Sequence, residues 1–156
     1  MAGILPTAIH KGKRYYLIGR ESKFPESGLY ADFGGHKDKG ESILNTAIRE
    51  GFEETIGIIG DKKKIGSLIK NKLYKKIKIN NDALYIIKIK YDKDLPKKFD
   101  NKYKTLCNFL KKSPKNIQNK FEIYIEKDKI KWVTKEQLLS NKKSLRKLFI
   151  KQAKLL

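Results

Sequence analysis

A chain of 156 residues with 39% hydrophobic residues is long enough to bury one core without disulfide or metal support, so we expect a single domain over residues 1–156. No apolar run approaches the roughly 20 residues of a membrane span, the N-terminus lacks a cleavable signal, and the single cysteine excludes an internal disulfide, which together favour an intracellular, cytoplasmic protein. The formal net charge of +20 favours polyanionic partners, and without a long apolar run there is no reason to expect a membrane partner.

The first predicted elements form a β-hairpin. Residues 3–9 (GILPTAI) and 14–20 (RYYLIGR) are short apolar runs on either side of the turn-forming sequence HKGK. A third strand is predicted within residues 29–35 (LYADFGG), where Gly34 and Gly35 interrupt it. The chain is therefore expected to begin with a β-sheet.

From Ser42 the hydrophobic period becomes that of a helix. Apolar residues recur every four positions, as in a helix that packs one stripe on a sheet; they are Leu44, Ile48, Phe52 and Ile56, flanked by Ile43 and Ala47. Ser42 is the expected N-cap, because its hydroxyl can accept a hydrogen bond from a free backbone N–H of the first turn. Gly57 and Gly60 are expected to end this helix.

The rest of the chain predicts further strands and helices. The predicted strands are residues 65–70, 83–91 and around 130–133; the predicted helices are residues 97–112 after Pro96 and two more from Lys135 and Ser144; residues 121–126 are a short apolar run. Cys107 is expected to be a buried thiol on a helix. Strands around an early helix, with helices added at the end, predict an α/β sandwich on a mixed sheet.

Three glutamates gather on one face of the first long helix. At about 100° per residue, Glu50, Glu53 and Glu54 lie close together and away from the apolar stripe. Like charges three or four residues apart repel, so we expect a counter-charge. Magnesium fits this role, because it accepts carboxylate oxygens and bridges to phosphates. Judged from the three glutamates alone, a surface cluster paired with nearby lysines is the simpler alternative.

The surrounding residues have a definite spacing. From Gly35 the chain reads G-x5-E-x7-R-E-x-x-E-E, and the fixed positions are Gly35, Glu41, Arg49, Glu50, Glu53 and Glu54. This spacing resembles the Nudix box, G-x5-E-x7-R-E-U-x-E-E-x-G-U with U aliphatic, the signature of hydrolases that cleave nucleoside diphosphates linked to another moiety. The match covers residues 35–57, with weaker agreement over most of the chain.

The resemblance implies a Nudix-like α/β/α sandwich on a mixed β-sheet and assigns roles to the matched residues. It implies that Glu50, Glu53 and Glu54 bind Mg²⁺ or Mn²⁺ together with the carbonyl of Gly35, which approaches an ion closely because no side chain intervenes. It also implies that Arg49 belongs to the catalytic group and forms a supporting ion pair. The partner of Arg49 in that pair is Glu41, which holds the loop on the helix.

Two positions depart from the family pattern. Gly51 replaces an aliphatic residue, at a cost of about 1 kcal/mol relative to alanine inside a helix, so we expect unusually close packing there. The closing glycine comes one residue later, at Gly57, which is expected to lengthen the helix end without moving the ligands. This ending after Asp-Phe-Gly-Gly resembles Nudix proteins of large DNA viruses and some eukaryotes; a viral protein would act in the host cytoplasm.

A pyrophosphate hydrolase also needs a base that orients or deprotonates water. The segment EKDKIKWV resembles the glutamate-then-tryptophan stretch of mRNA-decapping members, which makes Glu126 the candidate base and Glu122 the runner-up. A turn residue among lysines is an equal alternative for Glu126. Trp132 is expected to lie in the core rather than to stack on a base.

Several residues near the box are candidates for substrate binding. His36 follows the metal-binding glycine and is a candidate for phosphate contact, with a solvated loop histidine as the alternative. Phe24, Tyr30 and Phe33 are candidates for stacking on a nucleobase, with a place in the core as the alternative for each.

The sequence leaves the substrate open. The first hypothesis is hydrolysis of a small nucleotide, the second is decapping of an RNA 5′ end, and the third is a non-catalytic module that binds RNA or another polyanion. The positive charge favours RNA, but only four of the 37 basic residues are arginines, and abundant lysine and isoleucine also result from an A/T-rich genome. The isomerase branch of the superfamily is set aside, because Cys107 lies in the wrong region for its chemistry.

Overall fold

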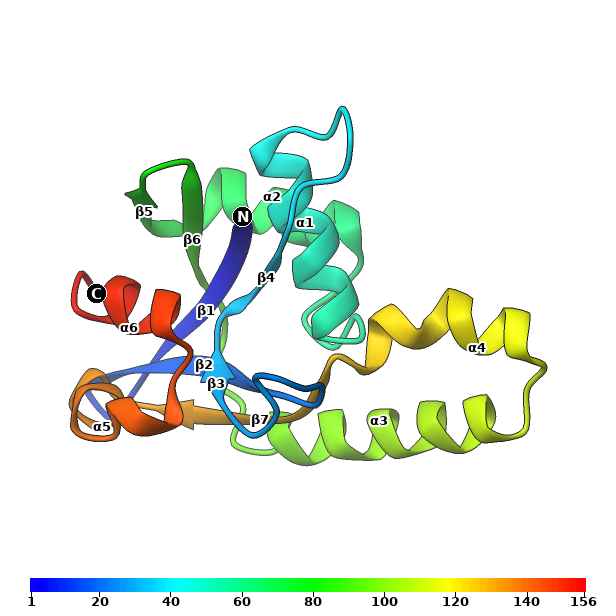
Figure 1. Ribbon diagram of the computed structural model, residues 1–156. Helices are drawn as coiled ribbons and strands as arrows, with labels where there is room; N and C mark the ends of the chain where they lie inside the picture. The colour runs from blue at the N-terminus through cyan, green and yellow to red at the C-terminus, as the bar shows by residue number, and fades with distance from the viewer.

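The computed structural model describes residues 1–156, which form one mixed β-sheet with helices on both faces (Figure 1). The strands are β1 (Ala2–His10), β2 (Lys13–Glu21), β3 (Tyr30–Ala31), β4 (Phe33–Gly35), β5 (Leu73–Ile79), β6 (Asp82–Lys88) and β7 (Lys127–Val133). The α-helices are α1 (Ile43–Glu54), α2 (Lys62–Asn71), α3 (Leu95–Lys111), α4 (Lys115–Phe121), α5 (Lys135–Ser140) and α6 (Lys147–Ala153). The α/β class predicted from the sequence is confirmed.

The sheet is organised around the N-terminal hairpin. Its main path runs β3-β2-β1-β6-β5, while β4 pairs with β1 and β7 pairs with β2. The β1–β6 pair is parallel and every other pair is antiparallel. Because β4 pairs with the first residues of β1, the glycines at its end lie beside the start of the chain.

Two hydrophobic cores flank the sheet, because neighbouring strand residues point to opposite faces. Ile4 belongs to the core under α1, α2 and α3, whereas Leu5 belongs to the core under α5 and α6. Tyr85 and Ile86 divide between the two cores in the same way. This alternation produces the predicted sandwich of helices, sheet and helices.

Helix α1 begins as predicted but presents a different face to the sheet. The hydroxyl of Ser42 accepts a hydrogen bond from the backbone N–H of Asn45. The expected apolar stripe is only partly packed, with Leu44 42% exposed. The buried residues of the helix are Thr46, Ala47, Glu50, Gly51, Glu53 and Glu54. The acidic residues are therefore buried, which the helical wheel of apolar positions did not predict.

The C-terminal end of α1 is shorter than predicted. The helix stops at Glu54, and the backbone turns through left-handed conformations at Ile56 (φ 53°) and Gly57 (φ 64°). The backbone N–H of Gly57 donates to the carbonyl of Phe52, which closes the helix end. The later glycine thus accommodates a two-residue left-handed turn and does not lengthen the helix.

One prediction about the later elements is wrong, and one strand was missed. Residues 65–70, predicted as a strand, belong to helix α2, where Ile65, Leu68 and Ile69 are buried at helical spacing. The lysine-rich strand β5 was not predicted, because few of its residues are buried. The short apolar run 121–126 begins at the last residue of α4, continues through a 3₁₀ turn (Glu122–Ile125) and ends in a bend at Glu126. The other predicted elements are present with shifted ends, and Cys107 is half-buried on α3.

Helices α3 and α4 form a hairpin that projects from one end of the sheet (Figure 1). The chain returns from it through the 3₁₀ turn to β7, which begins beside α1. This path carries Glu126 and Lys127 to the acidic face of α1. No helix in the structure has the length and apolar character needed to cross a membrane.

Candidate functional site

The site is built where α1 packs against the glycines of β4. The carboxylate Oε2 of Glu54 accepts a hydrogen bond of 2.6 Å from the backbone N–H of Gly34. The carboxylate of Glu50 lies against Gly35, where an added Cβ would stand 2.6 Å from the carboxyl carbon of Glu50. Only glycine at position 35 permits this approach, so backbone and carboxylates share one small space.

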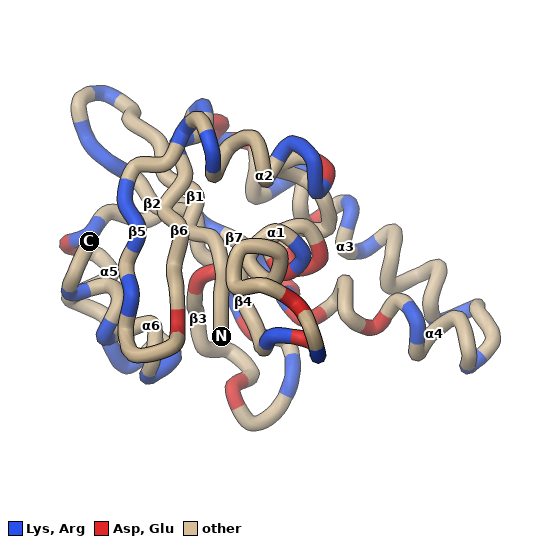
Figure 2. Tube along the Cα trace, turned by 90° about the horizontal axis from the view of Figure 1, so that it is seen from above, with Lys and Arg blue, Asp and Glu red and all other residues tan.

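A cavity of about 200 Å³ opens at this contact. It is lined by five glutamates with two basic groups and the β4 glycines: Met1, Glu21, Glu26, Gly34, Gly35, His36, Glu50, Glu54, Glu126 and Arg146. Acidic residues gather around α1 and β4, whereas lysines cover most of the other elements (Figure 2). A concentration of negative charge in this basic protein therefore lines a cavity.

Arg49 fixes the acidic loop and the helix to one another. Its guanidinium donates from Nε and Nη2 to the two carboxylate oxygens of Glu41, both at 3.0 Å, and from Nη1 to Glu50 at 2.8 Å and to Glu53 at 3.1 Å. The Arg49 hydrogen bonds hold the pKa of Glu41 down to about 2. The geometry expected for the Glu41–Arg49 pair is thus present, and Nη2 also reaches the carbonyl of His36 at 2.9 Å.

Glu53 points away from the cavity. Its carboxylate contacts Arg49 on one side and Lys62 at 3.9 Å on the other, and it does not line the cavity with Glu50 and Glu54. No group of three or more His, Cys, Asp or Glu side chains is arranged to hold a metal ion. Of the three predicted carboxylate ligands, the structure brings two, Glu50 and Glu54, into one cavity beside Gly34 and Gly35.

Buried Lys127 is a member of the site that the sequence did not reveal. Its side chain is 0% exposed, because Gly19 on β2 leaves space for the aliphatic stem to pass. The ammonium forms an ion pair with Glu21 and lies 3.4 Å from Oε1 of Glu54. Burial alone would lower the pKa of Lys127, but the charges of Glu54 and Glu21 outweigh burial and raise it.

The missed residues carry no distinguishing signal in the sequence. Lys127 stands among other lysines in the segment EKDKIKWV, and Glu21 ends a strand that reads as an ordinary hairpin arm. Arg146 is equally inconspicuous, yet its Nη1 donates to Glu21 at 3.1 Å and its Nε lies 2.6 Å from Glu26. These contacts join residues more than one hundred positions apart, so only the fold reveals them.

The two cavity glutamates of α1 are held in an environment that disfavours their charge. Burial raises the pKa of Glu50 to about 7, even though Arg49 opposes this effect. Burial also raises the pKa of Glu54 well above its usual value, against the opposing charge of Lys127. A further cation in the cavity would relieve both, because an opposite charge favours the ionised form of a carboxylate.

The donor set fits a hard divalent cation. Glu50, Glu54 and the close backbone of Gly35 offer oxygen atoms in one cavity, which is the ligand chemistry that Mg²⁺ and Mn²⁺ prefer. The space that a Cβ at Gly35 would fill is taken by the carboxylate of Glu50, so the absence of a side chain brings this carboxylate to the backbone. We regard the residues present as compatible with the predicted metal.

The remaining predicted residues fall into different places. Glu126 lines the cavity, and its carboxylate lies 3.5 Å from the ammonium of Lys23. Glu122 is exposed, outside the cavity, and pairs with Lys23 at 3.3 Å. Trp132 packs against the first core and donates from Nε1 to the carbonyl of Asp92 at 2.8 Å, as a core residue would.

The candidates for substrate contact divide in the same way. His36 is exposed and lines the cavity, and Phe24 is 93% exposed in the loop after β2. Phe33 is 0% exposed in the first core, so its prediction as a stacking residue is wrong: neither ring face is free for a base. Tyr30 is half-buried beneath Lys131, whose Nζ lies 3.8 Å from the ring centroid.

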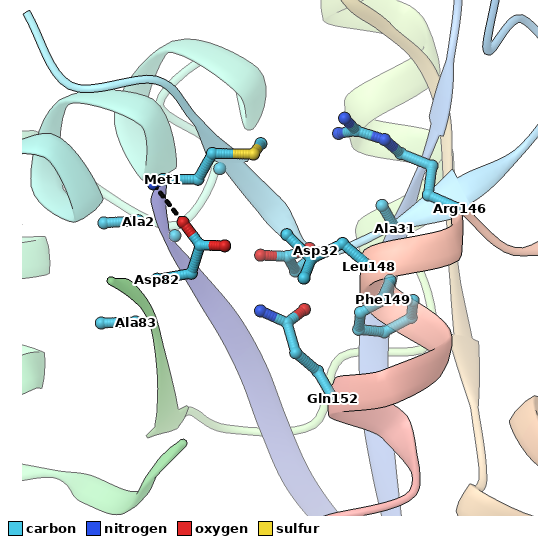
Figure 3. Close-up of a pocket in the computed structure, with 12 residues that line it drawn as sticks. Met1, Ala2, Ala31, Asp32, Asp82, Ala83, Arg146, Leu148, Phe149 and Gln152 are labelled. Carbon is cyan, nitrogen blue, oxygen red and sulfur yellow. Dashed lines mark hydrogen bonds and ion pairs between the residues drawn. The ribbon is translucent and has the colours of Figure 1, made fainter. Parts of the chain in front are cut away.

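A narrow pocket adjoins the cavity on the α6 side. It shares Met1, Gly34 and Arg146 with the cavity, and Asp32 and Gln152 point toward one another inside it (Figure 3). Its free space of about 10 Å³ suits a water-sized group. Burial raises the pKa of Asp32 to about 6, against the opposing charges of Lys127 and Arg146.

No protein-family model and no curated protein matches the sequence, whereas solved structures match the fold. An Ap4A hydrolase from C. elegans, in a binary complex, gives a TM-score of 0.55 at 16% identity, covering 98% of this chain and 90% of that one. NrtR from Shewanella oneidensis gives 0.54 at 14% identity, covering 98% of this chain but 59% of its own. The NUDIX domain of NrtR, complexed with ADP ribose, gives 0.50 at 14% identity, covering 99% of this chain and 84% of that one.

These likenesses identify the fold as that of the Nudix hydrolases, as the resemblance of residues 35–57 implied. The chain spans about three fifths of the length of NrtR. At such low sequence identity the comparison shows the fold alone. The chemistry has to be argued from the cavity itself.

Proposed function

We propose that the protein is a metal-dependent Nudix pyrophosphohydrolase that cleaves a P–O–P bond in a substrate containing a nucleoside diphosphate. One observation carries the proposal: buried Glu50 lies against Gly35 and buried Glu54 accepts from the backbone N–H of Gly34, in a cavity that Glu126 also lines. A surface cluster of acids paired with lysines would leave these side chains in solvent. Here they are enclosed, and the pKa values of Glu50 and Glu54 are raised.

The chain's own residues divide the chemical work. Glu50 and Glu54 would hold Mg²⁺ or Mn²⁺ with the Gly35 carbonyl, and the metal would neutralise the diphosphate and activate water. Glu53, held by Arg49 in this structure, is the predicted third carboxylate ligand. Glu126 is the proposed base, because its carboxylate faces the same cavity and can accept a proton from the attacking water.

Supporting residues keep these groups in place. Arg49 ties Glu41 of the loop to Glu50 of the helix, and Lys127 ties the end of α1 to β7. His36 and Arg146 line the same cavity and can donate to phosphate oxygens. Phe24 is exposed in the neighbouring loop and is the proposed stacking residue for a nucleobase.

A small nucleotide is the substrate class that the comparisons favour. One structural neighbour is an Ap4A hydrolase and another is a domain complexed with ADP ribose. The second candidate is the 5′ cap of RNA, which the cavity-lining position of Glu126 favours through the resemblance to decapping members. A purely non-catalytic polyanion-binding module would have no reason to bury mutually repelling glutamates.

A panel of substrates tests the proposal. Dinucleoside polyphosphates, ADP-ribose, nucleoside triphosphates and capped RNA are incubated with the protein and Mg²⁺ or Mn²⁺, and the products are identified by mass. We expect Glu54→Gln to lower kcat by at least about 100-fold with the fold intact by circular dichroism. Glu122→Gln is the matched control, because Glu122 lies outside the cavity and should leave turnover unchanged. Equal turnover of wild-type protein and Glu54→Gln would refute the assignment.

A further inference from the structure

A second and larger cavity lies apart from the catalytic one. It encloses about 840 Å³ between α2, the end of β6 and the start of α3. Its lining residues are Ile58, Ile59, Lys64, Leu68, Lys72, Lys88, Ile89, Lys90, Tyr91, Asp92 and Leu95, and none of them lines the catalytic cavity. We call it the lysine groove. The proposed hydrolase chemistry makes no use of it.

The floor of the lysine groove is apolar and ends at an aromatic ring. Isoleucine and leucine side chains from the turn after α1, from α2 and from the start of α3 form this floor. The ring of Tyr91 stacks on His10 with centroids 4.2 Å apart and lies 5.3 Å from Trp132. These neighbours hold Tyr91 in place while it stays half-buried at the groove.

The rim of the groove is positive and uncompensated. Lys64, Lys72, Lys88 and Lys90 are exposed and form no salt bridge in the structure. The only acidic lining residue, Asp92, is bonded to Lys98 at 2.6 Å and so is already neutralised. Four positive charges from different segments thus surround one concave apolar surface, and a polyanion would offset their repulsion.

We propose that the lysine groove binds a segment of single-stranded nucleic acid. The lysines contact its phosphates, and the bases lie on the apolar floor and on Tyr91, which is the combination that single-strand binding sites use. A duplex hides its base faces and offers chiefly phosphates, so it has no use for the apolar floor. The proposal of a single-stranded rather than a double-stranded nucleic acid therefore rests on the apolar floor together with the positive charge.

Binding of a fluorescent oligouridylate tests this proposal. The probe has about 12 nucleotides, carries no 5′ phosphate, and is titrated in EDTA with anisotropy as the readout. We expect the triple variant Lys72→Gln, Lys88→Gln, Lys90→Gln to weaken binding at least tenfold. Its slope of log affinity against log salt should fall by about 2, because each phosphate contact to a single strand contributes about 0.7. The corresponding triple of Lys→Arg substitutions should bind like wild type.

A matched triple elsewhere separates the groove from net charge. Lys142→Gln, Lys143→Gln, Lys151→Gln removes the same charge from exposed positions near α5 and α6, and it should change affinity less than twofold. Equal loss in both triples would mean that binding follows net charge alone and would overturn the proposal. Duplex RNA binding as tightly as the single strand, or displacement of the oligonucleotide by an equal concentration of ATP, would overturn it as well.

The test is independent of catalysis. EDTA removes divalent metal, and the variant Glu54→Gln, which lacks hydrolysis under the proposed function, should bind the oligonucleotide as wild type does. Hydrolysis without oligonucleotide binding would therefore reject only the proposal that the lysine groove binds nucleic acid. Groove binding without hydrolysis would reject only the proposed activity.

Discussion

Lys127 and Glu54, both buried, meet with 3.4 Å between Nζ of the lysine and Oε1 of the glutamate. The contact joins the first residue of β7 to the last residue of α1. Because Glu126 immediately precedes Lys127, the same contact sets where the proposed base stands relative to the α1 carboxylates. A buried cation thus organises a site whose other members are mostly acidic.

Replacing Lys127 should cost much of the stability of the protein. Lys127→Met leaves Glu21 and Glu54 buried without their shared cation, and removing one partner of a buried ion pair costs about 3–5 kcal/mol. Urea denaturation measures the change. Lys129→Met, on the same strand but exposed, should stay within about 0.5 kcal/mol of wild type.

A second variant separates charge from packing at this position. Glu54→Gln combined with Lys127→Met removes the carboxylate that is left without a cation, since Glu21 keeps its pair with Arg146, and should recover part of the lost stability. If the double variant were as unstable as the sum of the two single ones, the lysine would act by filling space, and its electrostatic role would be wrong.

The sequence predicted what local spacing encodes. The hairpin and the Ser42 cap follow from residues close together in the chain, the resemblance to the Nudix box implied the Glu41–Arg49 pair, and the structure contains all three. Lys127 and Glu21 come into contact only because β7 pairs with β2, and no local sequence pattern predicts this pairing. The burial of the acidic face of α1 was not predicted either. An apolar stripe identifies the face of a helix that packs on the sheet only when that face is apolar.

The errors in secondary structure have a related cause. In residues 65–70, an apolar run too short to separate strand from helix by length was read as a strand, although Asp61 caps a helix there. Strand β5 is lysine-rich because it lies at the edge of the sheet, where most of its side chains meet solvent. Lysine runs of this kind carry little periodic signal.

Gly51 should resist replacement by alanine. Alanine favours a helix over glycine by about 1 kcal/mol, but a Cβ at this position would stand 2.6 Å from Cδ1 of Ile4, which is fully buried in the first core. Overpacking of about 1–3 kcal/mol should therefore outweigh the gain, and thermal denaturation should show a lower midpoint for Gly51→Ala. Adding Ile4→Val, which removes Cδ1, should make Gly51→Ala less costly than in the wild-type background.

The Glu41–Arg49 pair should make the free energy of unfolding depend on pH. The pKa of Glu41 falls to about 2 in the folded protein from a usual 4.5, so its contribution is present above pH 4.5 and is lost as the pH falls toward 2. With screening by solvent we expect the contribution to be about 1–2 kcal/mol. Denaturation curves of wild type and Glu41→Gln should differ at pH 6 and converge near pH 2. Parallel curves across this range would contradict the assignment.

Metal affinity should rise with pH through neutrality. Glu50 has a pKa of about 7 in the metal-free protein, so at pH 6 most of it is protonated and must release a proton before it can bind a cation. Titration calorimetry with Mn²⁺ should therefore show affinity rising by up to about tenfold per pH unit below 7 and levelling above about 8, with proton release at the lower pH. Glu50→Gln should bind more weakly and depend less steeply on pH, because only Glu54, whose pKa is also raised, then has a proton to release, whereas the exposed Glu122→Gln should retain the full dependence. A pH-independent affinity in wild-type protein would show that Glu50 is not a ligand, and the metal site would then have to be sought at the other cavity carboxylates.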